Sequence, residues 1–234
     1  MASHKKIDWI RPTRRIPIQL RDPVRRHARQ AGEIIWCWNL LNDHLFDLFV
    51  LLLESTSWSR SFDIGHAIWN TFQSDKAQRE MLLNTAKAAF PPEQKFKAAL
   101  APDLKREFIL PEIGWLVRQV DDLAKHRNDV AHVPIRFGVL DEKTVVLSVI
   151  TASGRSGAVE RLRKQPTSEI WLQLRGDLLA LTGYAWLLSM SIRRDGRPPW
   201  PRRPLLRCVP MNIQKPTPKG HRPPSATRKP PPKS

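Results

Sequence analysis

Three residues that could together cleave a phosphodiester bond lie close to one another in the chain. They are Arg127, Asn128 and His132, in the pattern Arg-Asn-x-x-x-His. A histidine that titrates near neutral pH can move a proton to or from a ribose 2′-hydroxyl or a leaving oxygen. An arginine can hold a phosphate through two hydrogen bonds, and the asparagine can orient either group. This combination suits RNA cleavage without a metal ion.

The pattern lies at the end of an amphipathic helix. The apolar residues before it recur at three- and four-residue steps, and they are Ile113, Leu116, Val117, Val120, Leu123 and Ala124. Such spacing predicts a helix with one buried face, and Arg127 falls on that face. Pro134 keeps Val133 out of the helical conformation. We therefore expect His132 in the last helical turn, where the helix dipole favours the charged imidazolium.

A structural role is the alternative for the same residues, with Arg127 in a buried ion pair and His132 capping carbonyl groups. In both roles a charge on the buried face needs a partner. A long apolar helix is predicted from Pro23 to about Leu53, and we expect the partner among its carboxylates Glu33, Asp43 and Asp47. A solvent-facing edge of that helix is the other interpretation of Asp43 and Asp47.

The segment from Arg127 to His132 resembles the motif of the HEPN superfamily. That motif closes a helix. In it an Arg is followed directly by a polar residue, and four positions separate the Arg from a His. Residues 31–42 are similar to the first helix of a group of bacterial HEPN-like helical proteins. Those proteins typically carry a Glu where this chain has Asn42. The likeness covers roughly residues 30–150.

The resemblance implies an all-α, HEPN-like helical bundle that forms a homodimer and uses no cofactor or metal. It implies a metal-independent endoribonuclease of toxin, phage-defence or RNA-processing type. In that enzyme His132 would transfer the proton, Arg127 would hold the phosphate and Asn128 would orient them. A toxin would also have a cognate antitoxin or another protein partner.

Two other functions fit the same sequence. Asn42 in place of Glu favours a non-catalytic, dimeric HEPN-like module that binds RNA or acts as a scaffold. The third possibility is an adaptor whose basic ends recruit a protein partner, with the helical part only supporting them.

The formal charge of +17 lies in the two ends of the chain. Residues 1–30 hold nine Lys and Arg against two Asp, whereas residues 197–234 hold ten Lys and Arg and no acidic residue. Such ends attract phosphate backbones with an affinity that falls as salt rises. An anionic membrane surface or an acidic protein would attract them too, so charge alone leaves the partner open.

Composition divides the chain into three parts. Residues 1–22 are a basic, Pro-containing arm, residues 23–193 are the HEPN-like helical domain, and residues 194–234 are a Pro/Arg/Lys-rich tail that we expect to be disordered. Only the beginning of the tail offers apolar side chains that could dock on the domain, namely Trp200, Leu205 and Leu206.

Other local patterns complete the predicted fold. Alternating residues after Pro134, a polar turn at 141–144 and a β-branched run at 145–150 predict a small β-hairpin. A last helix begins near residue 167 and closes the bundle. Asp75 and Gln78 resemble a capping box at the start of another helix.

Cysteine usage favours the cytoplasm. Cys37 falls in the first long helix and Cys208 in the tail, which indicates neither a disulfide framework nor a cysteine-based metal site. Polar residues recur through the first helix too often for a membrane span. We therefore expect a cytoplasmic protein that does not span a membrane.

Overall fold

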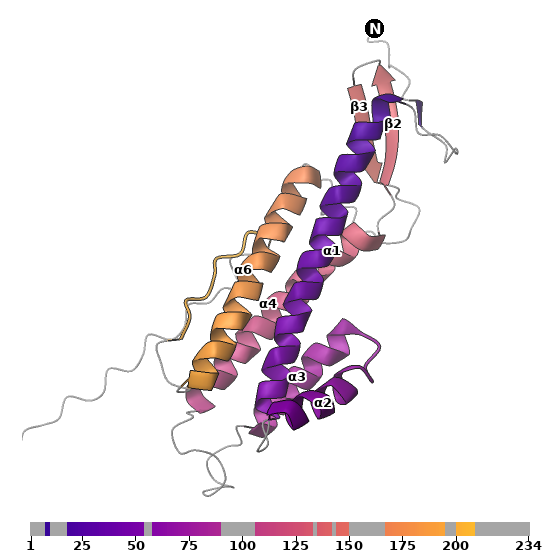
Figure 1. The fold of residues 1–234 in the computed structure, drawn as a ribbon. Helices are drawn as coiled ribbons and strands as arrows, with labels where there is room; N and C mark the ends of the chain where they lie inside the picture. Colours follow the sequence, from indigo (N-terminus) through magenta and orange to yellow (C-terminus); the bar gives the residue numbers. More distant parts are fainter. Residues whose placement is uncertain are drawn as a thin grey trace, which may run out of the picture.

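A computed structural model of the chain describes residues 8–9, 18–53, 58–89, 106–132, 135–141, 144–149, 167–194 and 200–208. Within these ranges the chain forms five helices: α1 (Ile18–Leu52), α2 (Trp58–Trp69), α3 (Asp75–Ala89), α4 (Arg106–His132) and α6 (Thr167–Arg194) (Figure 1). The hydrophobic core is built from helices, so the fold is all-α, as the sequence predicts.

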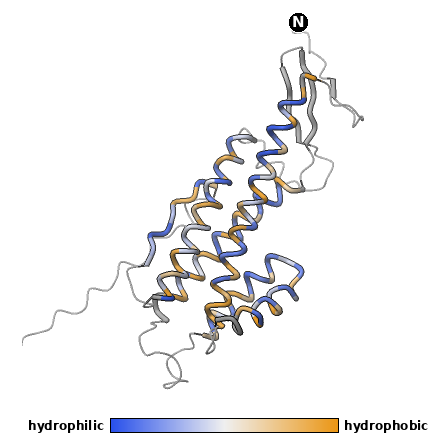
Figure 2. The backbone as a smooth tube through the Cα atoms, in the orientation of Figure 1, coloured by the Kyte–Doolittle hydropathy of each residue, from blue (hydrophilic) through white to orange (hydrophobic). Residues whose placement is uncertain are grey.

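The central element is α1, which contacts α2, α3, α4 and α6. Figure 1 shows α6 running along one side of α1, with α2 and α3 on the other side. The first turns of α1 are hydrophilic and its later turns are hydrophobic (Figure 2). A helix that is apolar around much of its circumference can pack against neighbours on several sides, which explains the central position of α1.

The helix begins at Ile18, so Pro23 lies inside α1 and not before it. Leu20 is 1% exposed and anchors this early part of the helix. Pro23 is the sixth residue of the helix and lacks the N–H that would bond to the carbonyl of Gln19, so the start of α1 has one backbone hydrogen bond fewer. The helix therefore takes up residues that composition assigned to the N-terminal arm.

The apolar stripe predicted on α4 faces the core. Its members Ile113, Leu116, Val117, Val120 and Leu123 are buried. They join a cluster with residues of α1, such as Leu41 and Leu45, and of α6, such as Leu174 and Leu181. This burial confirms the orientation of α4 and places Arg127 on its inward side.

A small antiparallel sheet stands at the N-terminal end of α1 (Figure 1). It contains β1 (Asp8–Trp9), β2 (Ile135–Asp141) and β3 (Thr144–Val149), in that order. The register of β2 and β3 pairs Ile135 with Val149 and Phe137 with Leu147. Since β2 follows α4 so closely, the sheet marks where the C-terminal end of α4 lies.

Residues 200–208, which we call the strap, pack against α6 (Figure 1). The carboxylate of Asp177 accepts hydrogen bonds from the backbone N–H of Arg207, at 2.9 and 3.0 Å, and of Cys208, at 2.7 Å. Leu206 is buried and Leu205 is 72% exposed. The region expected to be a disordered tail thus contains an ordered segment. Leu205 was predicted to dock on the domain, but it faces solvent. Residues 209–234 lie outside the described ranges.

The strap is fastened by a buried ion pair. Arg203 donates two hydrogen bonds to Glu112 of α4, at 2.7 and 2.9 Å, and its guanidinium lies 5.3 Å from the centre of the Trp115 ring. The hydroxyl of Tyr184 donates to the same carboxylate. Burial and the neighbouring Glu112 raise the pKa of Tyr184 well above its usual range, so the phenol stays protonated and remains a donor.

None of the helices within the described ranges combines the length and the apolar composition that crossing a bilayer requires.

We expect the substitution Arg203→Ala to release the strap and expose Cys208. Burial and Asp177 raise the pKa of the Cys208 thiol to about 12, so it should react slowly with thiol reagents at pH 8. Loss of these contacts should increase its labelling rate on the order of tenfold or more, because the thiolate is the reactive form. The rate can be followed by mass spectrometry.

The matched control is Arg202→Ala, which removes an exposed arginine one residue away. If both variants label Cys208 at the wild-type rate, the ion pair does not hold the strap.

Candidate functional site

Arg127 is a half-buried side chain near the end of α4, 20% exposed and bound on several sides. Its Nη2 donates to Oδ2 of Asp75 at 2.5 Å, and its Nη1 donates to Oδ1 of Asn128 at 3.0 Å. The guanidinium lies 4.7 Å from the centre of the Trp38 ring, over its face. A carboxylate, an amide and an aromatic face therefore fix the position of the cation.

The partner of Arg127 is Asp75, so the prediction that it would be Glu33, Asp43 or Asp47 is wrong. Asp75 is the first residue of α3. The cap of α3 is instead Ser74, whose hydroxyl accepts the N–H of Ala77 at 3.2 Å. With the helix terminus capped by its neighbour, the carboxylate of Asp75 is available to α4.

The three carboxylates expected to pair with Arg127 have other surroundings. Glu33 binds Arg29 at 2.9 Å and Arg175 of α6 at 3.3 Å. Asp47 lies 3.4 Å from the ring of His44. Asp43 lines a cavity beside α2.

Trp38 is the buried centre of a partly exposed cluster that the sequence did not reveal. Its indole N–H donates to Oδ2 of Asp75 at 2.9 Å, the same oxygen that accepts from Arg127. The guanidinium of Arg79 lies 5.6 Å from the Trp38 ring, and its Nε donates to Asp121 at 2.8 Å. We call these five residues the Trp38 cluster. It joins α1, α3 and α4 through two arginines, each paired with a carboxylate.

Both arginines of the cluster keep a buried donor without an acceptor. Nε of Arg127 and Nη1 of Arg79 make no hydrogen bond within the described part of the chain. An unsatisfied buried donor is unfavourable. Arg127 therefore retains a donor for a further acceptor, such as a phosphate oxygen, provided that the side chain moves toward solvent.

Of the predicted catalytic residues, the structure brings Arg127 and Asn128 together. Asn128 is exposed and accepts a hydrogen bond from Arg127. His132 is the last residue of α4, five positions after Arg127, and its side chain lies outside the described residues. Five helical residues correspond to roughly 7.5 Å along the axis, so the backbone places His132 one to two turns beyond Arg127.

A polar cavity of about 280 Å³ adjoins the Trp38 cluster. Asn42 follows Trp38 by one turn of α1 and Gln78 follows Asp75 by one turn of α3, so the cavity and the cluster are neighbours. Most lining residues carry amide or other polar groups, and the set comprises Asn39, Asn42, Asp43, Phe46, His66, Trp69, Asn70 and Gln78. Its hydrogen-bonding groups and aromatic rings suit a flat polar molecule.

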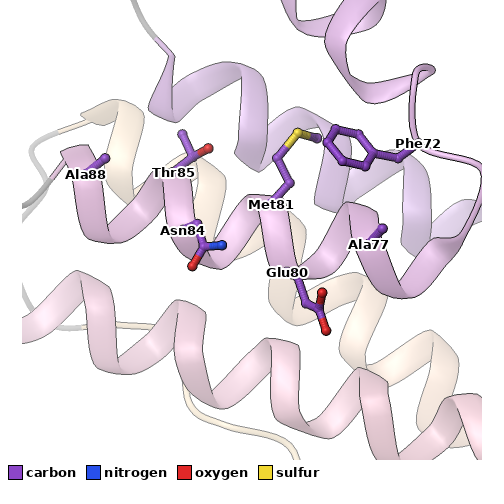
Figure 3. A pocket seen from close by; sticks show the side chains of 7 residues that line it. All are labelled: Phe72, Ala77, Glu80, Met81, Asn84, Thr85 and Ala88. Atoms are coloured by element: carbon purple, nitrogen blue, oxygen red, sulfur yellow. The ribbon is translucent and has the colours of Figure 1, made fainter.

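A second cavity, of about 460 Å³, lies along the outer side of α3 (Figure 3). Its lining includes Phe72, Glu80, Met81 and Asn84, and Figure 3 shows Met81 extended toward the ring of Phe72. This lining holds one carboxylate and no cationic side chain, so it offers nothing that would bind a phosphate.

The described residues contain no group of three or more His, Cys, Asp or Glu side chains that could hold a metal ion.

The chain matches no protein-family model, no curated protein and no solved structure at a significant level. The function is therefore inferred from the geometry around Arg127.

We expect Asp75→Ala to lower the free energy of unfolding by about 1–2 kcal/mol. The change leaves the Arg127 guanidinium and the Trp38 N–H without their shared acceptor, and solvent at the half-exposed Asp75 reduces the cost. Chemical denaturation followed by circular dichroism measures the difference.

Glu80→Ala is the control, because Glu80 forms only an exposed pair with Lys76 on the same helix, at 3.6 Å. Equal effects of the two substitutions would show that the cluster does not stabilise the fold.

Proposed function

We propose that this protein is a metal-independent endoribonuclease of the HEPN type, active as a homodimer in the cytoplasm. Its biological setting would be a toxin, phage-defence or RNA-processing system. The observation that carries the proposal is the state of Arg127: Asp75 and Asn128 hold it at the end of α4, and one of its buried N–H groups finds no acceptor among the described residues.

The proposed reaction is an internal attack by the ribose. His132 accepts the proton of the 2′-hydroxyl, and the oxygen attacks phosphorus while the bond to the 5′-oxygen breaks. The imidazolium of His132 then returns a proton to the leaving oxygen. Arg127 stabilises the negative charge on the phosphate, and Asn128 keeps the guanidinium oriented. The products are a 2′,3′-cyclic phosphate and a 5′-hydroxyl.

Asp75 both positions Arg127 and competes with RNA for it. The carboxylate neutralises the guanidinium through the contact at Nη2. A phosphate must therefore either displace Asp75 or use the donors that Asp75 leaves free. This competition predicts weak binding of free phosphate. Contacts other than Arg127 must then supply most of the affinity for RNA.

Two features could supply that affinity. The polar cavity beside the Trp38 cluster has amides and a carboxylate but no Lys or Arg in its lining, which suits an unstacked base and not a phosphate. The basic residues at the ends of the sequence would attract the phosphate backbone. The cavity favours single-stranded RNA as the substrate, because only an unstacked base could enter it.

The second candidate is a non-catalytic, dimeric RNA-binding or scaffolding protein. Two observations favour it. Asn42 replaces the Glu typical of the proteins that the chain resembles, and the charge of Arg127 is already neutralised by Asp75. Such a protein would bind RNA with a strong dependence on salt and leave it intact.

Cleavage of a labelled mixed-sequence RNA in excess chelator tests the proposal. We expect the wild-type protein to yield 2′,3′-cyclic phosphate ends, and we expect His132→Ala and Arg127→Ala to lower the rate by at least about a hundredfold. Arg118→Ala is the control, because Arg118 is an exposed arginine on the same helix.

An equal loss in all three variants would assign the effect to general charge and not to the site. Binding without cleavage by the wild-type protein, with or without a partner protein, would select the second candidate.

A further inference from the structure

The face of α6 that points away from the core carries a second row of apolar residues. Leu172 is 57% exposed, Leu179 is 39%, Trp186 is 51% and Met190 is 38%. Two exposed glycines, Gly176 and Gly183, complete the row. The spacing alternates between four and three residues, which is the pattern of the a and d positions of a helix pair.

This row, which we call the α6 seam, cannot be covered by the helices that α6 already contacts. The buried residues Leu174, Leu178, Leu181 and Leu188 face α1 and α4 from the opposite side of the helix. A helix with apolar residues on both sides is normally covered on both sides. Within the described ranges the α6 seam is therefore a face without a partner.

The packing of the described residues does not require the glycines of the seam. A Cβ atom added at Gly176 or at Gly183 would meet no atom of these residues within 4 Å. Glycine destabilises the interior of a helix relative to alanine. Two glycines on one exposed row therefore indicate room for side chains of another molecule.

The seam is complementary to itself in an antiparallel arrangement. With a two-fold axis at the level of Leu181, Trp186 faces Gly176 of the partner subunit and Leu179 faces Gly183 of the partner subunit. Each of these layers pairs a large side chain with a glycine, so the helices can approach closely. Leu172 then faces Met190 of the partner subunit, which fills the next layer with two apolar side chains.

The charges at the two ends of the seam match in the same register. Glu169 and Arg193 are exposed residues of α6, and the two-fold axis places Glu169 opposite Arg193 of the partner subunit at both ends. A parallel pair in register would instead place Trp186 against its own copy and like charges together. Size and charge therefore select the antiparallel arrangement.

We propose that the α6 seam is the interface of a homodimer, formed by two antiparallel copies of α6. A two-fold interface requires one patch that is complementary to itself, and the seam meets this requirement in its layers and in its charges. The interface uses no residue of the Trp38 cluster. It gives the dimer of the proposed function a defined surface, but it can be tested without any RNA.

The experiment is sedimentation of the full chain over a range of concentrations. We expect the wild-type protein to be dimeric, and we expect Gly176→Leu and Gly183→Leu each to weaken dimerisation at least about tenfold by filling the space for the opposing side chain. Circular dichroism should show unchanged or greater thermal stability of both variants, because an added Cβ meets no atom of the described residues and leucine is a better helix former than glycine.

Gly32→Leu is the matched control. Gly32 is a helical glycine of α1 that also has no atom within 4 Å of an added Cβ. This variant should sediment as a dimer, which separates the loss of a glycine from the loss of the seam.

Charge reversal tests the register. Glu169→Arg and Arg193→Glu should each weaken the dimer a fewfold, and the double variant should restore it. A monomeric wild-type chain would overturn the proposal. Glycine variants that dimerise as well as the wild type would overturn it too. A monomer that binds phosphatidylglycerol vesicles through Trp186 would also overturn it and assign the seam to a lipid surface.

Discussion

The arrangement of the helices depends on the shared acceptor Asp75. One oxygen of this carboxylate binds the indole N–H of Trp38 on α1 and the guanidinium of Arg127 on α4, while Asp75 itself begins α3. A cation on the buried face of α4 requires a carboxylate, and Asp75 at the first position of α3 supplies it. The polar cavity beside α3 and the approach to the end of α4 follow from this placement.

The same interaction limits what the site can do. An arginine that is already paired and oriented has little conformational freedom left to lose when it binds a phosphate. Its charge, however, is already neutralised by Asp75. In a nuclease built in this way the guanidinium is precisely positioned, but it binds the phosphate itself weakly. RNA would then be retained by other contacts, and a second subunit bound through α6 would double them.

The sequence was sufficient for the features that depend on local spacing. It predicted the all-α class, the buried stripe of α4 and the need of Arg127 for a carboxylate. It failed where the partner is distant in the chain: Asp75 lies 52 positions before Arg127, and Glu112 lies 91 positions before Arg203. Such pairs depend on how helices pack. The sequence also assigned Asp75 a different role, because Asp75 and Gln78 resemble a capping box.

In the proposed function Arg127 is the group that meets RNA. Arginine Nε–Hε resonances can be recorded during titration with a 2′-O-methyl RNA, which cannot be cleaved by the proposed reaction. We expect the resonance of Arg127 to shift on binding, because its Nε gains an acceptor that it now lacks within the described residues. Shifts confined to arginines at the ends of the chain, with Arg127 unchanged, would show that Arg127 serves only to hold the helices together.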